Sequence, residues 1–269
     1  MMLLEEAKQT LLRMEKESES KDGDVFFNCD GHRGELVLSN PARKNAMSIR
    51  MMRQLAGVVL SLRETELHLI CVRGDGGTFC SGGALNEVRR YLEYSNHGLV
   101  MSQAMTTVLD GLGALPILTC AWIDGYAVGG GAEIAVSCDV RLMHADAVLH
   151  FVHRKLGVVP GWGATRRLVR LLGATKALDM LVRAERLNAQ KCMSLGLVQE
   201  VSKLDCSDAM DQYFTSRLGT ATLLALKEQM TAATAQQRDG LESRAFGKVW
   251  GGSQHKAALE QVFSPRDKS

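Results

Sequence analysis

The sequence has no excess of charge of either sign. Its 269 residues contain 32 Lys and Arg against 30 Asp and Glu, which leaves a net charge of +2. A protein that binds nucleic acid through the phosphate backbone needs a broad basic surface. The near balance of charge therefore argues against a nucleic-acid partner.

The sequence also has no apolar run that approaches the length of a membrane-spanning helix, which is about 20 residues. We therefore expect no membrane partner. Residues 1–22 lack the apolar centre of a signal peptide, and their many glutamates make them too acidic for an ordinary mitochondrial transit peptide. The expected location is the cytoplasm, with the mitochondrion as the alternative.

A disulfide framework and a metal site are missing as well. The cysteines number seven, an odd count, and Cys71, Cys120 and Cys138 lie in apolar segments, as small buried hydrophobes of a reducing compartment do. Cys80 is either a packing residue or a nucleophile, and packing is favoured because no activating partner is visible in the sequence. The histidines do not fall at ligand spacing with Cys or carboxylates, so no metal is expected.

What the sequence does contain is an alternation of strands and helices. Apolar patterning predicts strands at 25–29, 35–38, 69–73, 116–123, 140–144, 147–152 and 196–201. Helices are predicted from a cap at Ser48 to about residue 63, at 97–115, from 164 onward, and at 207–218, 222–234, 240–248 and 253–263. This order indicates an α/β fold with crossover connections. We divide the chain into a charged, helix-compatible extension (1–22), a core (23–205) and a helical region (206–269).

Two glycine-rich turns each follow a predicted strand and precede a helix. Residues 78–85 read T-F-C-S-G-G-A-L, and residues 125–133 read G-Y-A-V-G-G-G-A-E. Glycine lets a ligand approach the main chain closely, and free N–H groups at a helix start favour negative charge. Together the turns can aim two N–H groups at one carbonyl oxygen, with Glu133 beside it as a general acid or base. The alternative is that Glu133 only complements the helix dipole.

Four stretches in this order resemble the crotonase (enoyl-CoA hydratase/isomerase) superfamily. The two glycine turns are similar to its oxyanion-hole motifs, and residues 40–47, N-P-A-R-K-N-A-M, to its early CoA-contacting loop. Residues 157–168 resemble the loop and helix that follow its second catalytic position, and the similarity covers about residues 24–260. The resemblance implies a crotonase-like spiral of ββα units with a C-terminal helical trimerisation region, assembled as a homotrimer or a dimer of trimers.

The resemblance also implies a substrate and the groups that meet it. The substrate is an acyl-CoA thioester, so coenzyme A is part of the substrate and no separate cofactor is expected. By motif position, the backbone N–H groups of Ser81 and Gly130 stabilise the thioester enolate. Arg43 and Lys44 meet the CoA phosphates, or else they occupy a solvated turn. The residues implied to contact CoA or the acyl group are Arg43, Lys44, Ala46, Gly82, Gly83, Ala84, Leu85, Val128, Gly129, Pro160 and Gly161.

The chain departs from the family at two positions. Hydratases of the family carry two glutamates that activate one water; Glu133 stands at the first position, but His153 occupies the second. A histidine can be a base, an acid or a protonated partner for a carboxylate, yet it cannot replace the second carboxylate of that pair. His153 could instead be a loop residue with no direct role, and His150 faces the other way if the segment is extended. At the second departure, Ala84 replaces an aspartate that normally orders the first turn.

Residues 138–143, 151–163 and 249–252 resemble the family's decarboxylases of short 2-alkylmalonyl-CoA more than its hydratases. Loss of CO₂ from ethylmalonyl-CoA or methylmalonyl-CoA leaves a thioester enolate, and Glu133 or His153 would return a proton to Cα. An ionised Glu133 would repel the substrate carboxylate, so it must be protonated or offset. Two alternatives stay open: an enoyl-CoA hydratase or isomerase of fatty-acid metabolism, and a non-catalytic CoA-binding or interaction protein.

Overall fold

The computed structural model describes residues 2–18, 21–91, 95–215 and 250–263, together with Lys227, Gln229 and Gly247. Apart from those three single positions, the predicted helices at 222–234 and 240–248 lie outside the described residues. In the part that is described, no helix is both long and apolar enough to cross a membrane. The division of the chain at residues 22 and 205 stays a prediction.

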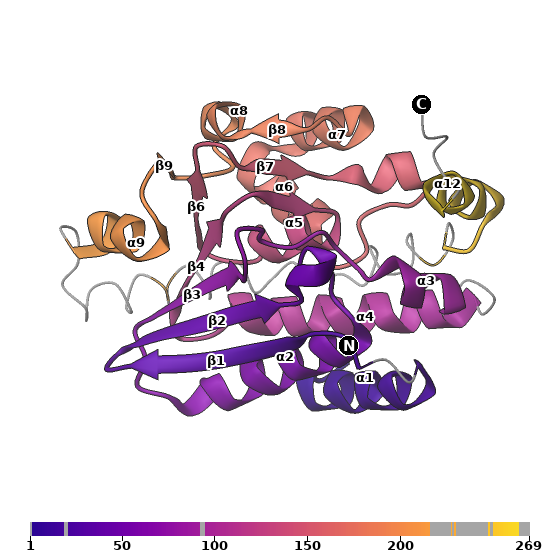
Figure 1. The fold of residues 1–269 in the computed structure, drawn as a ribbon, viewed down its shortest axis with the longest axis horizontal. Coiled ribbons are helices and arrows are strands. Elements are labelled where there is room, and N and C mark those ends of the chain that lie inside the picture. The colour runs from indigo at the N-terminus through magenta and orange to yellow at the C-terminus, as the bar shows by residue number, and fades with distance from the viewer. Residues whose placement is uncertain are drawn as a thin grey trace.

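A six-stranded sheet forms the centre of the molecule (Figure 1). Its strands, in spatial order, are β1 (Asp24–Asp30), β2 (Arg33–Ser39), β3 (Leu69–Gly74), β4 (Leu118–Ile123), β6 (Val140–His144) and β9 (Glu200–Ser202). β1 and β2 pair antiparallel, and every later pair is parallel. All of β4 is buried, as expected of a strand with both faces covered. The prediction of an α/β fold with crossovers is confirmed.

A second sheet of three strands carries one of the two glycine turns. It consists of β5 (Tyr126–Val128), β7 (Val148–His150) and β8 (Leu187–Asn188). β5 and β8 were not predicted, because two or three residues are too few to show an alternating pattern. β7 is shorter than the predicted strand at 147–152, and a 3-10 helix, Val152–Leu156, follows it.

Helices cover both faces of the six-stranded sheet. On one face α1 (Leu4–Ser18), α2 (Ile49–Ser61) and α4 (Ser95–Gly113) pack together. α2 begins as predicted, since the Ser48 hydroxyl accepts the Met51 N–H at 3.1 Å. α1 lies within the predicted N-terminal extension, and four of its apolar side chains belong to the main core: Leu4, Ala7, Leu11 and Met14.

The other face is covered in part by α9 (Cys206–Thr215), whose Met210 and Phe214 pack on alternate residues of β3 and β4. The remaining helices are α3 (Leu85–Tyr91), α5 (Gly130–Ala135), α6 (Ala164–Leu172), α7 (Ala174–Arg183), α8 (Ala189–Leu195) and α12 (Ser253–Phe263). α12 lies at the opposite side of Figure 1 from α9 and packs against the 3-10 helix.

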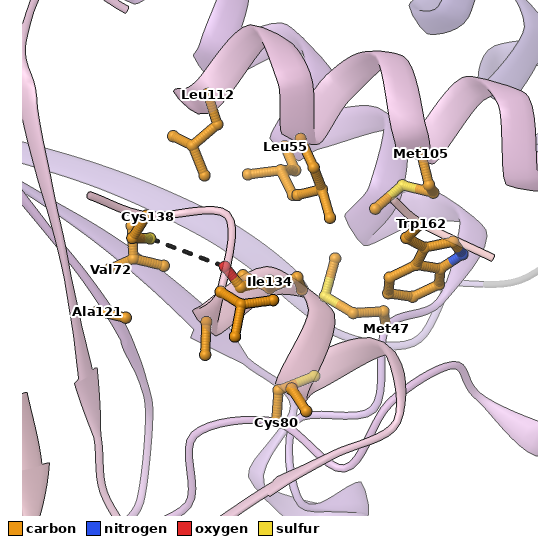
Figure 2. Packing of buried hydrophobic residues seen from close by; sticks show 14 of the residues in the cluster. Met47, Leu55, Val72, Cys80, Met105, Leu112, Ala121, Ile134, Cys138 and Trp162 are labelled. Carbon is orange, nitrogen blue, oxygen red and sulfur yellow. Dashed lines mark hydrogen bonds between the residues drawn. The ribbon is translucent and has the colours of Figure 1, made fainter. Parts of the chain in front are cut away.

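The main core surrounds the short helix α5. Figure 2 shows Ile134 of α5 among side chains from distant elements, with Trp162 beside Met105. Cys80 and Cys138 are fully enclosed here, and burial raises the pKa of each thiol to about 12. A thiol with that pKa is not a nucleophile at neutral pH. The interpretation of Cys80 as a packing residue is confirmed, and all seven cysteines are free thiols.

Candidate active site

The two glycine turns lie against each other through their main chains. The Cys80 N–H donates to the Tyr126 carbonyl, and the Val128 N–H donates to the Cys80 carbonyl, both at 2.9 Å. A Cβ added to Gly131 would lie 2.1 Å from the Cys80 carbonyl oxygen, so only glycine permits this approach. The folded chain therefore brings together the two turns that the sequence separates.

Within the first turn, the Ser81 N–H is not available to a ligand. It donates to the Lys44 carbonyl at 2.9 Å, which contradicts the predicted role of Ser81 in the oxyanion hole. The Gly82 N–H lies 3.4 Å from the Cys80 thiol, and the Ala84 N–H donates to a carbonyl of the 40–47 loop. Gly83 has no hydrogen-bond acceptor for its N–H among the described residues. The free donor of this turn is therefore two positions after the predicted one.

Backbone pairing replaces the aspartate that the family usually has at position 84. The Met47 N–H donates to the Gly82 carbonyl at 2.7 Å, and the Ala84 N–H donates back to the Met47 carbonyl at 2.9 Å. Ala84 itself is buried. These bonds order the turn, so the loss of the aspartate does not disturb it.

In the second turn, Gly130 is the first residue of α5, and an N–H at that position has no acceptor within its own helix. Gly129 before it has φ 54° and ψ −119°, which favours glycine. A Cβ on Gly130 would lie 2.2 Å from the Trp162 indole ring. The predicted donor at Gly130 is thus placed in the site, with the indole packed over it.

The Glu133 carboxylate is buried, with the residue 2% exposed, and it accepts four hydrogen bonds. Oε1 accepts from the Gly161 N–H at 3.2 Å and from His153 Nε2 at 3.0 Å. Oε2 accepts from the N–H groups of Trp162, at 2.7 Å, and Ala164, at 3.2 Å. Ala164 begins α6, so the carboxylate also lies at the positive end of a helix dipole.

His153 projects from the 3-10 helix and is buried. Because the carboxylate of Glu133 already accepts main-chain N–H groups on both oxygens, the hydrogen between the two side chains lies on His153 Nε2. Nδ1 has no partner in the described part of the chain. The ring is thus fixed by its carboxylate partner, and Nδ1 is the nitrogen left for a substrate.

His150 has a structural role instead. Its Nε2 lies 2.9 Å from the Ala184 carbonyl oxygen, and burial lowers the pKa of the ring, so it stays neutral and donates this bond. The 3-10 helix, not an extended segment, sets the direction of His153, so the predicted alternation does not apply.

These groups surround a cavity of about 100 Å³ that is walled mainly by apolar side chains. Of the predicted residues, Ser81, Gly82, Gly83, Leu85, Gly129, Gly130, Glu133, His153 and Gly161 line it. The sequence did not predict the other lining residues Val88, Met101, Val152, Leu156, Val158, Trp162, Trp250, His255 and Leu259. Trp250 was within the resembling segment 249–252, whereas a single histidine at position 255 gave no signal.

The other predicted contacts surround the cavity without lining it. Ala46, Ala84, Val128 and Pro160 belong to the turns and loops behind it. The Arg43 carbonyl accepts a hydrogen bond from the Ser81 hydroxyl at 3.1 Å, which joins the 40–47 loop to the first turn. The Arg43 side chain pairs with Asp22 at 2.9 Å, and Lys44 Nζ lies 5.5 Å from the centre of the Tyr126 ring.

Comparison with known proteins places the site in a family. The Enoyl-CoA hydratase/isomerase family matches residues 34–246. The chain belongs to this family. Solved structures support the fold: enoyl-CoA hydratase from Bacillus halodurans has a TM-score of 0.79 at 22% identity and covers 88% of this chain and 99% of that one. Enoyl-CoA hydratase from Mycobacterium avium subsp. paratuberculosis K-10 has a TM-score of 0.78 at 20% identity, covering 87% and 97%. The predicted crotonase-like fold is confirmed.

Within the enoyl-CoA hydratase/isomerase family, the chain is similar to proteins named ethylmalonyl-CoA decarboxylase. The Danio rerio protein is 38% identical over 238 residues, which are 83% of this chain and 78% of the relative. The Gallus gallus protein is 36% identical over 240 residues, 84% of this chain and 79% of the relative. The Homo sapiens protein is 40% identical over 169 residues, and the matched part covers 62% of this chain and 55% of the relative.

Proposed function

We propose that this family member is a carboxy-lyase that decarboxylates short 2-alkylmalonyl-CoA thioesters, with ethylmalonyl-CoA and methylmalonyl-CoA as substrates. One observation carries the proposal: the described residues that line the cavity combine two free N–H groups with one carboxylate, Glu133, that is hydrogen-bonded to His153. A hydratase of this family needs a second carboxylate at that position to activate water. The similarity to ethylmalonyl-CoA decarboxylases supports the same activity.

The reaction needs only the groups that line the cavity. The thioester oxygen accepts the N–H groups of Gly83 and Gly130. The bond between Cα and the carboxylate carbon breaks, CO₂ leaves, and the electron pair moves into the enolate, whose negative charge develops on that oxygen. Each such donor is worth about 10²–10³ in rate. An apolar wall favours the neutral CO₂ over the carboxylate.

His153 then returns a proton to Cα. An imidazolium at this position pairs with the Glu133 carboxylate through Nε2 and carries its second proton on Nδ1, the nitrogen without a partner. Glu133 is not the proton donor in this proposal, since its two oxygens already accept four hydrogen bonds. In this proposal Glu133 is offset from the substrate carboxylate and acts by orienting His153.

The CoA end of the substrate is assigned to the 40–47 loop. Arg43 and Lys44 carry positive charge at the outer side of the first glycine turn, where they would meet the phosphates, and the Ala46 main chain would lie near the pantetheine. The Ser81 bonds to Arg43 and Lys44 support this assignment because they tie the loop to the turn that holds the thioester.

We also propose that the protein works as a homotrimer or a dimer of trimers. α6 and α7 expose four large apolar side chains, namely Val169, Leu171, Leu178 and Val182. Contiguous apolar surface is typical of a subunit interface, and these two helices pack against each other. The compartment, cytoplasmic or mitochondrial, stays a prediction.

The test is a comparison of ethylmalonyl-CoA, methylmalonyl-CoA and crotonyl-CoA, with products followed by mass. We expect CO₂ loss from the first two and no addition of water to the third. His153→Gln should lower kcat for decarboxylation by about 10²–10⁴ because it removes the proton donor. Hydration of crotonyl-CoA without decarboxylation would refute the proposal, and binding of all three without turnover would favour a non-catalytic protein.

A further inference from the structure

A second histidine enters the cavity from the far end of the chain. His255 lies in the first turn of α12, is 2% exposed and lines the cavity with Trp250, whose ring centre is 4.8 Å from its own. The Gly251 N–H donates to His255 Nδ1 at 2.9 Å. Nδ1 therefore holds a lone pair, and the ring hydrogen is on Nε2.

The two histidines of the cavity differ in their partners. His153 is paired with Glu133, whereas His255 has no acidic partner in the described part of the chain. Burial lowers the pKa of His255 to about 4, so this ring is neutral at pH 7. No acceptor for its Nε2–H is found in the residues that the structure describes. A donor in a cavity wall with no protein acceptor can bind a ligand that supplies one.

The substrate has one polar group that the proposed chemistry leaves without a partner. The thioester oxygen accepts hydrogen bonds from Gly83 and Gly130, and Cα receives its proton from His153. The carboxylate that leaves as CO₂ still needs a donor, and Glu133 cannot provide one. The Nε2–H of His255 is a side-chain donor on the described cavity wall that is available for this carboxylate.

We propose that His255 recognises the substrate carboxylate through its neutral Nε2–H and so selects 2-carboxyacyl-CoA esters over acyl-CoA esters that lack the carboxylate. This inference rests on the proposed decarboxylase function. A neutral donor suits the reaction, because a second cation beside His153 would further stabilise the ionised carboxylate in the ground state and slow its loss as CO₂. α12 therefore contributes to substrate specificity as well as to the wall of the cavity.

The experiment compares binding of ethylmalonyl-CoA with binding of butyryl-CoA, which is the same ester without the carboxylate. Binding is followed in a stopped-flow instrument by the fluorescence of Trp162 and Trp250, before turnover proceeds. We expect His255→Met to weaken the binding of ethylmalonyl-CoA about 10- to 100-fold, which corresponds to the loss of one hydrogen bond to a charged group. Butyryl-CoA should bind within about twofold of wild type. His255→Gln should recover most of the affinity, because its amide can accept from Gly251 and still donate.

Leu259→Ala is the matched control, since Leu259 lies one turn further along α12 and lines the same cavity. This variant removes apolar contact and should weaken the binding of both esters by the same factor. Equal weakening of both esters by His255→Met, or no weakening, would overturn the inference, as would failure of His255→Gln to differ from His255→Met. Binding that discriminates through His255 without any decarboxylation would refute the proposed function and leave the recognition role standing.

Discussion

The carboxylate of Glu133 accepts hydrogen bonds from three main-chain N–H groups and one histidine, so it organises one loop, the start of a helix and the ring of His153 at once. The N–H groups belong to the loop at 161–162 and the start of α6. Arg167 supports the same loop by donating to the Trp162 carbonyl at 2.7 Å. A single anionic side chain therefore fixes the wall of the cavity and the direction of His153.

Glu133→Gln should be both less stable and less active. The amide keeps one acceptor oxygen, but its NH₂ group faces donors, so at least one buried N–H loses its partner. The free energy of unfolding should fall by about 1–3 kcal/mol, measured by urea denaturation. Activity should fall with it because His153 is no longer oriented. Unchanged stability would mean that the four bonds do not all form in solution.

His255 should make stability depend on pH. Its folded pKa of about 4 lies below the ordinary value of 6.5, so the unfolded chain binds the proton more tightly. The contribution of neutral His255 to the free energy of unfolding is complete above about pH 6.5 and is lost as pH falls toward about 4. Between pH 7.5 and pH 5, wild type should lose about 2 kcal/mol more than His255→Gln, measured by urea denaturation at each pH. Equal losses of stability in wild type and His255→Gln would contradict the lowered pKa of His255.

At the scale of elements, the site depends on how closely α5 approaches the first glycine turn. β5 leads into α5 and is bridged to the first turn at Cys80 and Ala127. The triple glycine then passes between the Cys80 carbonyl and the Trp162 ring with no room for a side chain. The free N–H groups of Gly83 and Gly130 share one cavity only because these main chains touch.

Gly131→Ala should separate the two turns. Its Cβ would lie 2.1 Å from the Cys80 carbonyl oxygen, a main-chain atom that cannot move aside cheaply. We expect a loss of about 1–3 kcal/mol in the free energy of unfolding, together with loss of activity. Gly57→Ala in the interior of α2 is the control, because its Cβ would meet only Lys8 Cε at 3.9 Å. That variant should gain about 0.5–1 kcal/mol and keep its activity. Equal stability of the two variants would contradict the packing.

At the scale of the whole molecule, the two ends of the described chain meet the core in different ways. α1 is packed against α2 and α4, and none of its described residues lines the cavity. α12 closes the cavity with Trp250, His255 and Leu259. The C-terminal segment therefore belongs to the site, and the proposed subunit contact is assigned to the exposed apolar side chains of α6 and α7.

Leu178→Glu should disrupt the assembly. Leu178 is 65% exposed on α7, and a charge there would be costly to bury against a second subunit. We expect sedimentation velocity to show a trimer or hexamer for wild type and smaller species for the variant. Phe26→Ser is the control, since Phe26 is also exposed but lies on β1, away from α7. A wild-type monomer, or identical masses for wild type and Leu178→Glu, would refute the proposed interface.

Local sequence was sufficient for much of this protein. The Ser48 cap, the strands of the central sheet and the two glycine turns follow from propensity and pattern, which act over a few residues. Glu133 and His153 were assigned by resemblance to the two glutamate positions of the family, and their residue types limit the chemistry. Short β5 and β8 escaped prediction because their strands form only through pairing with β7.

Tertiary structure decided which groups are free to act. Whether the N–H of Ser81 or of Gly83 faces a ligand depends on Lys44 and Met47, which belong to a separate loop and take up the neighbouring donors. The same is true of His255, which reaches the cavity only because α12 packs on the 3-10 helix. Hydrogen-bond partners and cavity walls come from segments far apart in the chain, so no local pattern could assign them.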